Sequence, residues 1–176
     1  MEVADASKTI RNKLKMAGYT SKHVSVRSQS YSMGSSIKVE IKSAHVDPAI
    51  VLAASNCEEK ISYCQSSGEI LSGGNRFVNV EFDSKLVDVF GEEHEAGLTD
   101  AIARLKARNS QSALEPIEDT PFMVGHDRNC TSFTLWTEKS FSSYLFDVQQ
   151  GARVIARTLL LSGAVAKKIA SITARD

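Results

Sequence analysis

The alternation of apolar and polar positions in the first half of the chain predicts one helix followed by paired strands. Apolar residues recur at helical spacing through residues 5–17, and Gly18 can end this helix because glycine adopts left-handed conformations at little cost. Polar and apolar residues alternate in 23–27 and 36–42, which is typical of strands that bury one face. Residues 28–35 between them are rich in turn formers, so we expect a hairpin.

A second helix and a second hairpin are expected to complete this half. Asp47-Pro48 predicts a helix start, because proline suits the first helical turn. Residues 61–71 and 76–82 then flank Ser72-Gly73-Gly74-Asn75, whose glycines favour a tight turn. The order helix-strand-strand-helix-strand-strand predicts an α+β sandwich over residues 1–84.

The pattern in the second half, residues 85–176, predicts another α+β segment, and we expect it to share one core with residues 1–84. We expect a helix over 92–109, strands at 122–124 and 131–137, and a long last helix over 143–174. Apolar residues lie on more than one side of that last helix. It therefore belongs either in the core or in the seam of a homodimer, and we favour the homodimer.

Composition narrows the class of protein. Hydrophobic residues make up 42% of the 176 residues, and the longest apolar stretch, 154–172, is interrupted by Arg157 and Lys167, so we predict no membrane span. The three cysteines, Cys57, Cys64 and Cys130, are odd in number and lack a CxxC spacing. Together with an N-terminus that lacks a secretory signal, they predict reduced thiols in a cytoplasm.

The net charge of zero conceals an uneven distribution. Residues 1–45 carry eight Lys or Arg and three acids, residues 46–120 carry six and fourteen, and residues 121–176 carry seven and four. The middle of the chain is therefore acidic and both flanks are mildly basic. Such a pattern concerns partners and not the fold.

Two charged sets are candidate binding surfaces. The acidic set could dock on a basic partner and comprises Asp83, Asp88, Glu92, Glu93 and Glu95. The basic set could bind nucleic acid, with Tyr19 or Tyr31 available for stacking, and comprises Arg11, Lys13, Lys15, Lys22, Arg27 and Lys38.

No motif predicts catalysis. Cys130 lies close in sequence to His126 and Asp127, but a cysteine nucleophile also needs a positioned base and an oxyanion donor, which proximity across a turn does not supply. The glycines at 73–74 lack the Lys-Ser/Thr ending of a phosphate-binding loop. His94 and the acids around it are consecutive on a helix and cannot all converge on one ion. We therefore predict neither an enzyme nor a metal or cofactor site.

Three segments carry a resemblance to a known family: His23-Val24-Ser25-Val26-Arg27, Tyr31-Ser32-Met33-Gly34-Ser35-Ser36, and Ser67 to Val78 with its Gly-rich turn. Over about residues 5–82 the chain resembles small proteins of bacteriophages and mobile elements that are related to the large polyvalent protein-associated domains. The resemblance implies a phage or prophage origin, action in the bacterial cytoplasm and no catalytic residue.

Two hypotheses follow from these observations. In the first, the chain is a phage-encoded interaction protein of the anti-defence or anti-CRISPR kind, which inhibits a host complex through its acidic surface. In the second, it is a nucleic-acid-binding accessory module that uses the basic N-terminal helix and first hairpin. An enzyme that uses Cys130 is a third possibility, for which no substrate suggests itself.

Overall fold

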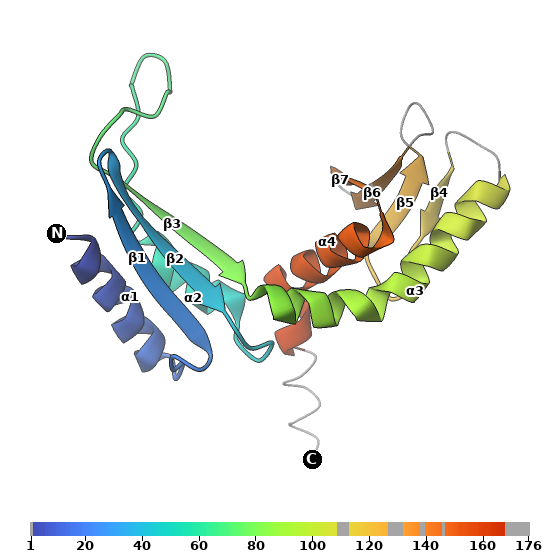
Figure 1. Ribbon diagram of the computed structural model, residues 1–176, viewed down its shortest axis with the longest axis horizontal. Helices are drawn as coiled ribbons and strands as arrows, with labels where there is room; N and C mark the ends of the chain where they lie inside the picture. The colour runs from blue at the N-terminus through green and yellow to red at the C-terminus, as the bar shows by residue number, and fades with distance from the viewer. Residues whose placement is uncertain (1, 109–112, 127–131, 138–139, 146, 168–176) are drawn as a thin grey trace. The chain divides into compact units, whose positions relative to one another are not determined.

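The structure is a computed structural model that describes residues 2–108, 113–126, 132–137, 140–145 (the backbone only) and 147–167. Its contacts divide the chain into two compact units (Figure 1). Unit 1 comprises Met1–Asp83 and Leu160–Asp176, and unit 2 comprises Ser84–Leu159.

Unit 1 is built on a three-stranded mixed sheet. Its elements are α1 (Val3–Met16), β1 (Val24–Tyr31), β2 (Gly34–Ile41), α2 (Pro48–Asn56) and β3 (Asn75–Phe82). The strand order is β1-β2-β3, with β1 antiparallel and β3 parallel to β2. Strand β1 is therefore an edge strand.

Both helices of unit 1 pack on the same face of this sheet. Helix α1 contacts β1 and β2, α2 contacts β3, and the two helices contact each other. Alternate β2 residues Ile37, Val39 and Ile41 point into this layer and are fully buried, whereas Lys38 on the opposite face is exposed. The core of unit 1 thus lies between the two helices and one face of the sheet.

Several predictions for this half are confirmed. The N-terminal helix, the first hairpin and the helix at Asp47-Pro48 all form, and Asp47 Oδ1 accepts a hydrogen bond of 2.9 Å from the Ala49 amide at the start of α2. The strands of the hairpin extend through most of 28–35, which was expected to be a loop.

The predicted second hairpin is wrong. Residues 61–71 form no strand, and the segment between α2 and β3 contains only the isolated bridges Lys60↔Arg76 and Tyr63↔Ile70. Strand β3 instead pairs in parallel with β2, from Gly34↔Asn75 to Ile41↔Phe82. The Ser- and Gly-rich segment before β3 lacks the regular apolar alternation of β2, which makes β2 the better partner.

Unit 2 is an antiparallel sheet with helices packed against it. Its elements are α3 (Ser84–Arg108), β4 (Leu114–Pro116), β5 (Phe122–His126), β6 (Phe133–Thr137), β7 (Ser140–Leu145) and α4 (Val148–Leu161), and its strand order is β4-β5-β6-β7. The strands predicted at 122–124 and 131–137 are confirmed as β5 and, from Phe133 onward, β6. A buried cluster joins α3, the sheet and α4 and comprises Leu98, Ala101, Ile102, Leu105, Ile117, Phe122, Val124, Leu135 and Ile155.

Two helices of this half have other bounds than predicted. Helix α3 begins at Ser84 and not at residue 92. Gly91 lies within this helix and is buried, and a Cβ there would lie 3.6 Å from the Ala152 backbone. The predicted helix over 143–174 starts too early and is interrupted at residues 162–163, beyond which residues 164–167 are helical again. Its first residues belong to β7, and α4 ends at Leu161 before Gly163, whose φ of +71° suits a helix terminus. Residues 168–174 lie outside the described residues.

The helices and sheets together confirm the predicted α+β class. Among the described residues, no helix combines the length and the apolar character that crossing a membrane would require.

Candidate nucleic-acid interface

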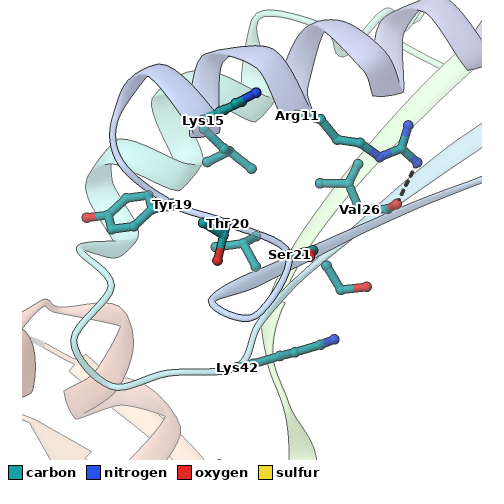
Figure 2. A pocket seen from close by; sticks show the side chains of 10 residues that line it. Arg11, Lys15, Tyr19, Thr20, Ser21, Val26 and Lys42 are labelled. Atoms are coloured by element: carbon teal, nitrogen blue, oxygen red, sulfur yellow. Dashed lines mark hydrogen bonds between the residues drawn. The ribbon is translucent and has the colours of Figure 1, made fainter.

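A groove lies between α1 and the first residues of β1 in unit 1 (Figure 2). Its volume is about 400 Å³. Helix α1, the turn after it, the start of β1 and the residue after β2 supply the lining: Arg11, Leu14, Lys15, Tyr19, Thr20, Ser21, Val24, Ser25, Val26 and Lys42. Three of these residues are cationic and three carry aliphatic hydroxyl groups. None of the lining residues in this described part of the chain is acidic.

Arg11 is held in place at one wall of the groove. Its Nη2 donates a hydrogen bond of 2.8 Å to the Val26 carbonyl oxygen (Figure 2). Its Nη1 donates one of 3.3 Å to Ser7 Oγ. A guanidinium has five N–H donors, so these two bonds leave further donors for a ligand. Both protein partners are neutral, and the positive charge of Arg11 is therefore not compensated by them.

Lys15 and Lys42 complete the cationic lining. Figure 2 shows Arg11 and Lys15 on α1 at one side of the groove and Lys42, just after β2, at the other. Neither lysine forms an ion pair with any residue that the structure describes. Three positive charges, two from α1 and one from the residue after β2, thus line one recess without a carboxylate among them.

Two other residues of the predicted basic set, Lys13 and Lys38, lie close to carboxylates. Lys13 Nζ lies 3.9 Å from Glu58 Oε1, and Lys38 pairs with Glu81 and, at 3.6 Å, with Glu40. The contact with Glu81 raises the pKa of Lys38, and a hydrogen bond to Cys57 raises the pKa of Lys13. Their charges are thus engaged by neighbouring groups and are less available to a phosphate.

Lys22 and Arg27 are exposed and do not line the groove. Arg27 pairs in register with Lys38 on the helix-free face of the sheet, whereas Lys22 lies in the turn between α1 and β1. The structure therefore brings two of the six predicted basic residues, Arg11 and Lys15, into the groove. It adds Lys42, which was missing from the predicted basic set although it is the last residue of the alternating stretch 36–42.

Hydrogen bonds of Tyr19 and Thr20 hold the turn at one end of the groove. Tyr19 Oη accepts a hydrogen bond of 3.1 Å from the Asp47 amide, and the Thr20 amide donates one of 3.2 Å to His23 Nδ1. The rings of Tyr19 and His23 meet edge to face at 6.3 Å. These contacts fix the turn, so Thr20 and Ser21 are presented at the groove by an ordered segment.

The acidic set is only partly brought together. Asp88, Glu92 and Glu95 lie one helical turn apart on α3 and line a depression of about 180 Å³ in unit 2, together with Gly91, Gln149 and Arg153. Arg153 Nε lies 2.7 Å from Asp88 Oδ1 and neutralises that carboxylate. Glu93 does not line this depression, and Asp83 belongs to unit 1.

The remaining candidates do not form a site in the described residues. His126 ends β5 and stacks on Phe133 at 5.5 Å, while Asp127 and Cys130 lie outside the described residues. No group of three His, Cys, Asp or Glu side chains that could hold a metal ion occurs in the part of the chain that is described. Burial lowers the pKa of His94, against the opposing effect of Glu93 and Asp119.

Comparisons with family models, curated proteins and solved structures found no match. The resemblance of residues 5–82 to phage and mobile-element proteins therefore stays a prediction.

Proposed function

We propose that the chain is a nucleic-acid-binding accessory module that works without catalysing a reaction. The observation that carries this proposal is the groove between α1 and β1, where Arg11, Lys15 and Lys42 surround a recess that no acidic residue lines. Unpaired Lys and Arg side chains bind the phosphates of nucleic acids well. They displace the counterions condensed on the phosphates, and the release of these counterions increases entropy.

The edge of β1 offers an alternative mode of binding that the groove does not favour. An edge strand can accept a peptide as an additional strand, provided that its outward backbone groups are free. Arg11 already occupies the outward carbonyl oxygen of Val26. Recognition of an anion by side chains therefore fits this position better than strand addition does.

The test is a charge-removal experiment with a matched control. The Lys15→Ala/Lys42→Ala variant removes two unpaired groove charges, and the Lys13→Ala/Lys38→Ala variant removes two charges that face carboxylates. Both variants change the net charge equally. Binding of short labelled DNA and RNA is measured by fluorescence anisotropy from 20 to 300 mM salt, a range chosen because phosphate binding weakens steeply within it.

We expect the groove variant to lose most of its affinity and the control variant to retain it. Equal losses in the two variants would show that only overall charge matters. If the unmodified protein binds neither DNA nor RNA at the lowest salt, the proposed function is wrong.

The acidic face of α3 supports a second candidate function. Glu92 and Glu95 lie beside Asp88 in one depression, and only Asp88 is paired there with Arg153. This face could dock on the Lys/Arg-lined groove of a bacterial complex that handles nucleic acid, and so inhibit it in the way that anti-defence proteins do. A phage origin and a homodimer stay predictions under either function.

A matched pair of charge reversals tests this second candidate. Glu92→Lys changes the depression, whereas Glu93→Lys makes the same change outside it. If the candidate is right, a complex isolated with the unmodified protein is inhibited by it and by the Glu93→Lys variant, but not by the Glu92→Lys variant. Equal inhibition by both variants argues against docking through this face.

A further inference from the structure

The floor of the groove differs in character from its rim. Leu14, Val24 and Val26 line the recess, and their side chains are almost entirely buried, with 3%, 5% and 9% of their surface exposed. They belong to the core of unit 1, so the floor is fixed by packing. The cations and hydroxyl groups stand around this apolar floor.

A phosphate group gains nothing from contact with apolar side chains, so the apolar floor indicates a ligand with an apolar part. In a duplex the faces of the bases are stacked on one another, and only base edges are exposed, in the grooves. A single strand can present an unstacked base, whose flat faces are stabilised by contact with aromatic and apolar side chains. The combination of apolar floor and cationic rim therefore matches one base together with its neighbouring phosphates.

The volume of the groove agrees with an occupant of that size. At about 400 Å³ it lies within the range of about 300–1,000 Å³ that is typical of pockets for one small ligand. The hydroxyl groups of Thr20 and Ser21 line the recess, and each can donate and accept hydrogen bonds. Such groups can reach the edges of a base, which an intact duplex keeps paired.

We infer that the nucleic acid recognised by this groove is single-stranded and that one unstacked base enters it. The base lies over the apolar floor and against the half-buried ring of Tyr19, and the adjacent phosphates lie on Arg11, Lys15 and Lys42. This inference rests on the proposed function and specifies its ligand. It also sets the salt dependence: three phosphate contacts with a single strand give a slope of log affinity against log salt of about −2.

The experiment compares four competitors for one labelled single-stranded oligonucleotide bound to the full chain. They are the same oligonucleotide without its label, its duplex, a strand of equal length with abasic sites throughout, and poly-glutamate. We expect the unlabelled single strand to compete at least about fivefold better than each of the other three, because stacking of one base on an aromatic ring, here that of Tyr19, contributes at least this factor.

The outcomes separate the inference from the proposed function. Equal competition by the duplex or the abasic strand overturns the inference, because no base is then needed, and leaves nucleic-acid binding intact. Equal competition by poly-glutamate also overturns the inference, because the groove would then bind acidic peptides or polyanions in general. If the labelled single strand does not bind but a labelled duplex does, the inference also fails. If neither binds, the proposed function itself fails.

A steric variant gives an independent readout. Ser21→Leu adds an apolar side chain at the recess without altering any charge, and Gln29→Leu makes a similar change on β1, outside the lining. We expect Ser21→Leu to remove the preference for the single strand over the abasic strand and Gln29→Leu to leave it unchanged. An unchanged preference in Ser21→Leu would place the base elsewhere and overturn the inference.

Discussion

The Nη2 atom of Arg11 lies 2.8 Å from the carbonyl oxygen of Val26, and this hydrogen bond joins α1 to the outer edge of β1. The carbonyl faces away from β2, where an edge strand would otherwise leave it unsatisfied or open to another chain. One side chain therefore stabilises the groove wall and supplies part of its positive charge.

We expect Arg11→Ala to lower the free energy of unfolding by about 1 kcal/mol, which is the usual net contribution of one hydrogen bond. Lys15→Ala, one turn further along α1, removes a charge that makes no such bond and should change stability by less than about 0.5 kcal/mol. Urea denaturation of both variants measures the difference. Equal stability of the two would mean that the bond to Val26 contributes nothing.

The parts of the fold that could be predicted from sequence are those determined by local pattern. The helix that ends before Gly18 and the helix start at Asp47-Pro48 depend on residues within one or two turns, and both are confirmed. The parallel pairing of β3 with β2 joins Asn75 to Gly34, and no local signal reports such a distant partner. The hairpin predicted from Gly73-Gly74 failed for this reason.

In the candidate site, too, local sequence predicts some features and distant contacts determine the others. Sequence identifies a basic helix, but Lys13 and Lys15 differ only in what lies beside them in space. Lys13 meets Cys57 and Glu58, which are more than forty residues away along the chain, whereas Lys15 faces the groove. Separating a neutralised lysine from an unpaired one therefore requires the tertiary structure. Charge counts alone could not do so.

Gly34 is where the strand pairing of unit 1 leaves no room for a side chain. A Cβ there would lie 2.5 Å from the Asn75 carbonyl oxygen, and Asn75 is itself held by hydrogen bonds to Ser62 and Leu71. We expect Gly34→Ala to destabilise the protein by about 1–3 kcal/mol, as overpacking does. Thermal and urea denaturation measure this.

Gly97→Ala is the control of opposite sign for Gly34→Ala. Gly97 lies inside α3, and a Cβ there would meet only Ile117 Cγ2, at 3.8 Å. Replacing a glycine in a helix interior by alanine should stabilise by about 0.5–1 kcal/mol. If Gly34→Ala is as stable as the unmodified protein, the parallel β2–β3 register is not as described.

We expect the thiol of Cys64 to be more acidic than that of an ordinary cysteine. Hydrogen bonds from the side chains of Ser66 and Ser67, and then from their backbone amides, lower the pKa of Cys64 to about 6. The Cys64 Sγ lies 3.2 Å from Ser66 Oγ. At pH 7 the thiolate should therefore predominate, and the thiolate is the form that reacts with alkylating agents.

The measurement uses a Cys57→Ser/Cys130→Ser background, in which Cys64 is the remaining thiol. We expect the rate of iodoacetamide alkylation to reach half its maximum near pH 6. Adding Ser66→Ala should move this midpoint upward, and adding Ser72→Ala, in the same segment, should not. A midpoint above about pH 8 in the background protein, near that of a free cysteine, would contradict the described hydrogen bonds.

His94 should make the stability of the protein depend on pH. Burial lowers its pKa from 6.5, and the nearby carboxylates of Glu93 and Asp119 only partly oppose this effect. As pH falls through 6.5, the unfolded chain therefore binds a proton more readily than the folded chain does, and the free energy of unfolding decreases. The stabilising contribution of the neutral imidazole is fully present above this pH and is lost below it.

We expect His94→Gln to show a smaller loss of stability than the unmodified protein between pH 7.5 and 5.5, measured by urea denaturation. His45→Gln, at an exposed position, is the matched control and should behave like the unmodified protein. An equal loss in His94→Gln would assign the pH dependence to other groups.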